Sequence, residues 1–268
     1  MDDVITDVPP PSRFLLDDLN NFATPPPPLP SPFLVFPSAD SAKKFSPSLL
    51  IIAMSTPSLH FLHHISSKTV VGTLILPEIP FSGNSIEPSL KDKSCNIYTL
   101  NDDSGGSIMI VLVQFPVTPE RAHAVAKLLI GERIVPERVL ILDSIRSSNF
   151  RGKLDPDETI AFKLETSLER KNSDIGESPL FKTLDYYPSG SVVDGLAAAL
   201  LSRCEVRKIK ATLCVSWPDL GFPVMSLVKI LLLKNALSGV SHAVDKDYEI
   251  EYLKMSRRRK QVDSDLYT

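Results

Sequence analysis

Three closely spaced histidines are the residues of this chain whose types best suit metal binding. His60, His63 and His64 have the spacing that places side chains on one face of a helix. A zinc site needs three or four protein ligands in a tetrahedral arrangement, and no Asp or Glu lies within ten residues of these histidines. We therefore expect ordinary loop or core histidines, with no metal and no other cofactor. A site completed by ligands distant in the sequence is the alternative.

Two serines stand where a helix N-terminus could activate a hydroxyl group. Ser189 and Ser191 lie in "YPSGSVVDG", ahead of a predicted helix, whose backbone N–H groups could bind an anion or support nucleophilic catalysis. The segment is not a Gly-x-Ser-x-Gly elbow, and no His is near it in the sequence. Phosphate-binding and dinucleotide-binding glycine patterns do not occur. The sequence favours a binding protein that is not an enzyme; a hydrolase or phosphorylase-like enzyme using Ser189 or Ser191 is the alternative.

The C-terminal ending, "DSDLYT", suggests a contact with another protein. It places Leu266 and Tyr267 beside the terminal carboxylate of Thr268, whereas a solvated tail is expected to be polar. Chance alone gives a hydrophobic-Tyr-any ending in about 1% of chains of this composition. We therefore predict that Leu266, Tyr267 and Thr268 enter a pocket on a partner. The basic run Arg257–Lys260 shortly before them is either a nuclear import signal, an electrostatic contact or simply a solvated surface.

Composition narrows the classes of partner. The 268 residues are 43% hydrophobic and 23% charged, and the formal charge of -3 lacks the basic field that nucleic-acid and membrane-surface binding need. Asp2, Asp3 and Asp7 have the wrong charge for a secretory or transit peptide, and no apolar run reaches about 18 residues. We expect a soluble cytosolic or nuclear protein. Three thiols without Cys-x-x-Cys spacing are expected to be buried and reduced: Cys95, Cys204 and Cys214.

We predict that the chain has three parts. Residues 1–47 contain many prolines, which remove backbone donors and favour extended conformations, so this stretch is predicted to be a disordered tail. Its "PPPPLP" is either flexible spacer or a ligand for a proline-reading domain of the SH3 or WW type. We place an α/β domain at 48–256 and a flexible C-terminal tail at 257–268.

Within that domain, short apolar runs alternate with amphipathic segments. "LLIIAM", "TVVGTLILP", "SIMIVLVQF", "RVLILD" and "ATLCVSWP" have strand length, and their continuous apolarity indicates strands covered on both faces. Thr118-Pro119-Glu120 predicts a helix start, and Gly131 its end. Ser191 and Asp194 predict a capping box for a second helix, and Pro223 opens a third. The polar stretch 165–179 is predicted to be a loop, and "DDSGGS" a hairpin turn. The fold class is α/β, with a mixed sheet sandwiched between helices.

Two segments carry a resemblance to a known family. "YYPSGSVVDGLAAALLSRCEVRKIKATLCVSWPD", Tyr186 to Asp219, together with the ending Leu266-Tyr267-Thr268, resembles the proteasome assembly chaperone 1 family, in a plant-like form. The resemblance runs loosely from about Ser48 to the C-terminus. It does not include the proline-rich tail, so it implies no role for that tail.

The resemblance implies a non-enzymatic chaperone for assembly of the 20S proteasome. Members of the family pair with proteasome assembly chaperone 2 as a heterodimer, sit on the ring of proteasome α subunits, guide its formation and block premature ring dimerisation. Their tails dock between adjacent α subunits. Carried onto this chain, the resemblance makes Leu266 the apolar anchor, Tyr267 the aromatic anchor, and Thr268 the bearer of a carboxylate that pairs with a pocket lysine.

Overall fold

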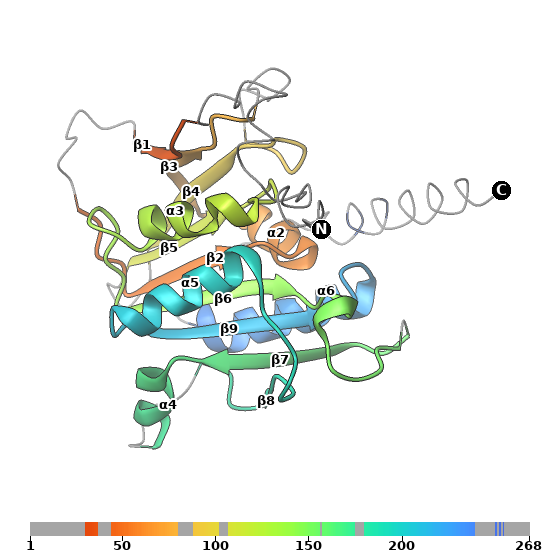
Figure 1. The fold of residues 1–268 in the computed structure, drawn as a ribbon. Coiled ribbons are helices and arrows are strands. Elements are labelled where there is room, and N and C mark those ends of the chain that lie inside the picture. The colour runs from red at the N-terminus through yellow and green to blue at the C-terminus, as the bar shows by residue number, and fades with distance from the viewer. Residues whose placement is uncertain are drawn as a thin grey trace, which may run out of the picture. The chain divides into compact units, whose positions relative to one another are not determined.

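One mixed β-sheet forms the centre of the protein (Figure 1). The structure, a computed structural model, describes residues 30–36, 44–79, 88–101, 107–155, 157–174 and 180–238, with residues 250, 252 and 254. Within these ranges the sheet has nine strands. They are β1 Phe33–Val35, β2 Leu49–Ala53, β3 Thr69–Ile75, β4 Cys95–Asn101, β5 Ser107–Leu112, β6 Arg138–Ser144, β7 Ile160–Glu165, β8 Asp185–Tyr186 and β9 Lys210–Trp217.

The sheet has a parallel centre and antiparallel flanks. Its order is β1-β3-β4-β5-β2-β6-β9-β7-β8. Strands β5, β2, β6 and β9 run parallel to one another. On one side β1, β3 and β4 continue the sheet antiparallel; on the other β7 pairs antiparallel with β9 and parallel with β8. The β4–β5 register brings Asn101 opposite Ser107, so the two strands expected on either side of "DDSGGS" do pair; residues 102–106 lie outside the described ranges.

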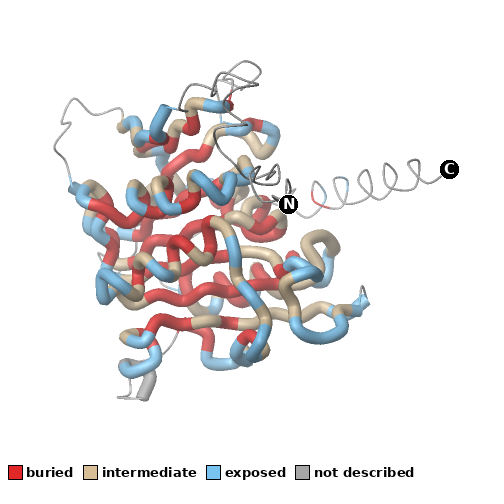
Figure 2. Tube along the Cα trace, viewed as in Figure 1, coloured by how far each residue is buried: buried red, intermediate tan, exposed pale blue. Residues whose placement is uncertain are grey.

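Helices cover both faces of the sheet, as the continuous apolar runs predicted. Leu50 and Ile52 of β2 pack into the core beneath α3 (Pro119–Leu129) and α5 (Gly195–Val206). The alternate residues Leu49, Ile51 and Ala53 pack into the core beneath α2 (Thr56–His63) and α6 (Phe222–Leu231). Figure 2 shows the resulting buried layer along the central strands. The α/β sandwich is therefore confirmed.

The remaining helical elements are short. They are η1 Ser147–Asn149, α4 Ser167–Asp174 and the π-helical turn η2 Leu232–Ala236, which continues α6. Among the described residues, no helix combines the length and apolarity that crossing a bilayer requires. The three cysteines are buried and free, as expected.

Helix α3 begins and ends as predicted. Thr118 is its N-cap with Pro119 at the first helical position, and Ala122, Val125, Ala126 and Leu129 are buried against the sheet. Gly131 follows the last turn, and a Cβ there would collide with the Lys127 carbonyl oxygen. Glycine is therefore required where the chain leaves the helix.

The predicted capping box before α5 is wrong. The helix begins at Gly195 with Asp194 as its N-cap, three residues after Ser191. The Ser191 hydroxyl oxygen instead accepts a hydrogen bond from the Arg151 backbone N–H at 2.9 Å. A turn closed from the Ser191 N–H to the Pro188 carbonyl keeps this stretch outside the helix.

Two stretches expected to lack regular structure contribute to the fold. Helix α4 lies within 165–179, a stretch whose polar sequence did not indicate a helix. Its Glu169 is fully buried and forms an ion pair with Arg138 of β6. Strand β1 lies within 1–47 and pairs with β3, so the compact unit begins at Ser31. Residues 33–36 are a proline-free apolar run, and an edge position tolerates the prolines that flank it.

Candidate functional site

The predicted partner-binding tail lies outside the described residues. This applies to Leu266, Tyr267 and Thr268 and to the basic run at residues 257–260. Their binding role stays a prediction. The structure does describe Tyr252, which fixes the chain to the domain before the tail begins.

Tyr252 anchors the C-terminal part of the chain under α2 and α6. Its side chain is fully buried, and its hydroxyl oxygen accepts a hydrogen bond from the Gly221 backbone N–H at 3.1 Å. Its ring packs edge-on against His60 of α2, with centroids 5.0 Å apart. Burial raises the pKa of Tyr252, so the hydroxyl keeps its proton. The anchor stands fourteen positions before Leu266, a reach of at most about 50 Å when extended.

The three histidines belong to the same cluster of rings. His60 is buried in α2 and stacks on His64, with ring centroids 4.5 Å apart. His64 Nδ1 lies 2.8 Å from the His60 carbonyl oxygen, and His63 contacts the His64 ring edge-on at 5.4 Å. In the described part of the chain, no group of three His, Cys, Asp or Glu side chains is arranged to hold a metal ion. The three rings therefore pack against one another, and His60 also packs against Tyr252.

The serines of the enzymatic alternative do not occupy the position that it needs. Neither Ser189 nor Ser191 stands at the N-terminus of α5, because the helix begins at Gly195. The Ser191 hydroxyl is engaged with the Arg151 N–H, and Ser189 is exposed on the preceding turn. The helix N-terminus therefore cannot activate either hydroxyl as proposed.

A cavity of about 280 Å³ lies at the carboxyl ends of the parallel strands. Its polar lining includes Thr56, Asp143, Arg146, Asp194 and Asp219. Crevices at this edge of parallel sheets are where many α/β proteins bind ligands. Sequence reasoning missed these residues, although Asp143 ends one predicted strand and Asp219 follows another, a signal that could have placed both at one edge.

Hydrogen bonds and partial burial set the electrostatics of this cavity. Thr56 Oγ1 donates to Asp219 Oδ2 at 3.0 Å, and the Ser144 N–H donates to Asp143 Oδ1 at 2.9 Å. Burial raises the pKa of Asp143, against the opposing effects of that N–H and of Arg146. Arg146 also pairs with Asp194 at 3.0 Å, but both side chains are about half exposed and the pair contributes little. The cavity can accept hydrogen bonds from a polar ligand.

The described residues thus define an α/β protein whose mixed sheet is covered by helices on both faces. No protein-family model matches the sequence, and no curated protein matches it either. The fold is similar to that of PbaA from Pyrococcus furiosus, an archaeal homolog of proteasome-assembly chaperone, with 16% identity, a TM-score of 0.57, and coverage of 89% of this chain and 95% of that chain.

Two further solved structures have a similar fold. Pyrococcus furiosus PbaB, an archaeal proteasome activator, has 13% identity and a TM-score of 0.55 over 89% of this chain and 99% of that chain. A protein of unknown function from Thermoplasma acidophilum has 14% identity and a TM-score of 0.55 over 83% of this chain and 88% of that chain. At such identities the likeness establishes a common fold. This chain has the fold of the archaeal proteasome-assembly chaperone homologues.

Proposed function

We propose that this protein is a chaperone of proteasome assembly that acts by binding and catalyses no reaction. The observation that carries the proposal is the fold that it shares with PbaA over 89% of the chain. The position of Ser191 outside helix α5 also favours binding over catalysis, because it removes the candidate nucleophile from the helix N-terminus.

In this proposal the chain pairs with proteasome assembly chaperone 2 and promotes formation of the 20S α-ring. The C-terminal tail docks into a pocket of the α-ring. Leu266 and Tyr267 fill the apolar part of that pocket, and the terminal carboxylate of Thr268 pairs with a lysine there. The support for these roles is the sequence resemblance, which includes the ending Leu266-Tyr267-Thr268.

The energetics require the folded body as well as the tail. Burying Leu266 and Tyr267 is worth about 2 to 3 kcal/mol each, and a charge-assisted bond to the carboxylate about 1.5 to 3 kcal/mol. Ordering each tail residue costs about 1 to 2 kcal/mol, so the isolated tail binds weakly. Once the body binds, the buried Tyr252 tethers the tail and makes its docking intramolecular.

The test is affinity capture from cells with three forms of the chain: intact, lacking the last three residues, and Ser264→Ala. The Ser264→Ala variant is the matched control, since it alters the tail but preserves its ending. We expect proteasome α subunits, identified by mass, with the intact and Ser264→Ala forms and a strong loss with the truncation. Undiminished recovery by the truncated form would refute the role of the tail, and absence of proteasome subunits from all three would refute the chaperone function.

The pairing with a second chaperone has its own test. Co-purification of the two chains after co-expression, followed by light scattering, is expected to give a one-to-one heterodimer. A chain that stays monomeric in the presence of that partner contradicts this part of the proposal.

A further inference from the structure

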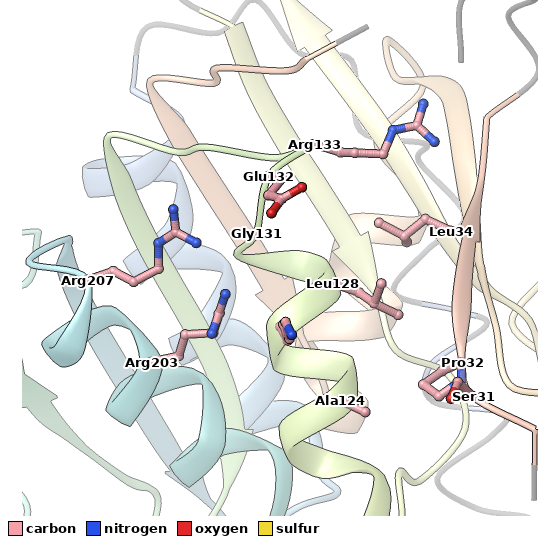
Figure 3. A pocket seen from close by; sticks show the side chains of 11 residues that line it. Ser31, Pro32, Leu34, Ala124, Leu128, Gly131, Glu132, Arg133, Arg203 and Arg207 are labelled. Atoms are coloured by element: carbon pink, nitrogen blue, oxygen red, sulfur yellow. The ribbon is translucent and has the colours of Figure 1, made fainter. Parts of the chain in front are cut away.

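A basic groove of about 680 Å³ lies where α3 and α5 end beside β1 (Figure 3). Pro32, Leu34 and Leu128 contribute its apolar surface. Four cationic side chains surround that surface: Lys127, Arg133, Arg203 and Arg207. We refer to these seven residues as the basic groove. Figure 3 shows that its arginines come from two parts of the chain, Arg203 from α5 with Arg207 at the C-terminal end of that helix, and Arg133 from the segment after α3.

The groove is positive although the chain as a whole is negative. Its lining has four cations against the single anion Glu132, whereas the whole chain has a formal charge of -3. The C-termini of α3 and α5 also lie here, and each adds about half a negative charge. A net charge of about +2 is left after this correction. The groove therefore attracts anionic groups.

Two of the cations are held in place by the protein. Arg203 Nε donates to the Ile130 carbonyl oxygen at the end of α3, which orders the guanidinium group. Burial and the neighbouring positive charge of Arg207 lower the pKa of Arg203. The Arg133 guanidinium lies 4.3 Å from the centre of the Phe36 ring. Among the described residues, buried Arg133 Nε has no hydrogen-bond acceptor. An arriving carboxylate would meet guanidinium groups that are already ordered, which lowers the entropic cost of binding.

We propose that the basic groove binds an extended acidic peptide segment of a partner protein. The carboxylates of the segment lie against Lys127, Arg203 and Arg207, and an apolar side chain between them rests on Leu34 and Leu128. The volume exceeds what a single small ion fills, and the apolar surface suits a side chain. Four cations around one hollow do not form the long basic track of a nucleic-acid surface.

This inference is independent of the tail-docking proposal. The groove lies with α3 and α5 over one face of the sheet, whereas Tyr252, which tethers the tail, is buried with α2 and α6 on the other. Removing the last three residues is therefore expected to leave peptide binding unchanged.

The probe is an array of octapeptides that combine Glu and Asp with Leu and Tyr in many orders, beside a matched array with Lys in place of the acidic residues. The best acidic peptide is then labelled, and its dissociation constant is measured by fluorescence anisotropy with the full chain. Lys127→Glu and Arg207→Glu alter exposed cations of the groove, and Lys153→Glu is the control, an exposed cation outside it. Circular dichroism checks that each variant is folded.

We expect selective binding of acidic peptides, weakened by added salt. Each groove substitution replaces an attraction by a repulsion and should weaken binding about tenfold, while Lys153→Glu should change it less than about twofold. Equal binding to the lysine array, or an equal loss in Lys153→Glu, would overturn the proposal. So would tighter binding of a single-stranded oligonucleotide than of every acidic peptide, because the groove would then be a nucleic-acid site.

Discussion

Removing the hydroxyl of Tyr252 tests whether this residue fixes the C-terminal chain to the domain. In Tyr252→Phe the Gly221 N–H loses its acceptor, 3.1 Å away, while the ring still fills its place against His60. A lost hydrogen bond of this kind costs about 1 kcal/mol. Amide hydrogen exchange at Gly221 should therefore become about fivefold faster, because 1.4 kcal/mol corresponds to about a tenfold change.

Tyr252→Ala should release the anchor altogether. Loss of a fully buried aromatic side chain costs about 3 to 5 kcal/mol. The tether to Leu266 then lengthens from 14 residues to at most 29, counted from the buried Leu237. Loop-closure entropy for that change is about 0.65 kcal/mol, about a threefold fall in effective concentration. Under the proposed function, capture of α subunits should weaken by about this factor.

Tyr186→Phe is the matched control for Tyr252→Phe, and it also serves as a reference for capture by Tyr252→Ala. It too removes a tyrosine hydroxyl, one that donates to Glu165 at 2.6 Å. Tyr186 lies in β8, the last strand in the sheet order. It should leave Gly221 exchange and α-subunit capture unchanged. The reasoning fails if Gly221 exchange is the same in Tyr252→Phe and the parent chain, or if Tyr252→Ala and Tyr186→Phe reduce capture equally.

Three further predictions concern other parts of the chain. Burial raises the pKa of the Asp143 carboxyl group, so the folded state binds its proton more tightly than the unfolded state does. The ionised carboxylate therefore lowers the free energy of unfolding as the pH rises above its pKa in the unfolded chain, about 3.9. Urea titrations should show that Asp143→Asn is more stable than the parent at pH 7, with the gain disappearing below about pH 4. Burial raises the pKa of the Cys95 thiol to about 11 and of Cys204 and Cys214 to about 12, so a thiol-reactive disulfide should label no cysteine of the native chain at pH 8 and all three after denaturation; native labelling would contradict their burial. We propose that Arg257–Lys260 directs part of a cytosolic pool to the nucleus, and replacing these four residues by alanine in a fluorescent fusion should confine it to the cytosol; an unchanged distribution would show that the run has another role.

The central strands were predictable because their burial is continuous. β2, β5 and β6 lie in the parallel centre, where both faces are covered, so their apolar runs identify them without knowledge of their neighbours. β7 escaped prediction because its "IAFKLE" contains Lys163 and Glu165, which pair with each other at 2.9 Å and are nearly inaccessible to solvent. From the sequence alone, two charged residues among six indicate an exposed segment, because the ion pair that allows their burial is not apparent.

The elements around the candidate site depended on contacts between distant residues. The Tyr252 anchor forms with His60 and Gly221, residues 192 and 31 positions earlier in the chain. No local pattern reports such a contact. The predicted capping box was wrong because the Ser191 hydroxyl accepts a hydrogen bond from the Arg151 N–H, forty positions away. This tertiary contact replaces the local hydrogen bond that the sequence pattern predicted.

The position of β2 has a consequence for synthesis on the ribosome. Leu49–Ala53 is wholly buried between β5 and β6, yet β5 ends at Leu112 and β6 at Ser144. Synthesis proceeds at about 5 to 20 residues per second. The apolar strand β2 therefore stays without one of its neighbours for roughly ten seconds, until β6 has been synthesised. During this interval the exposed strand can associate with other chains, so cells depleted of chaperones that bind nascent chains should accumulate this protein in aggregates.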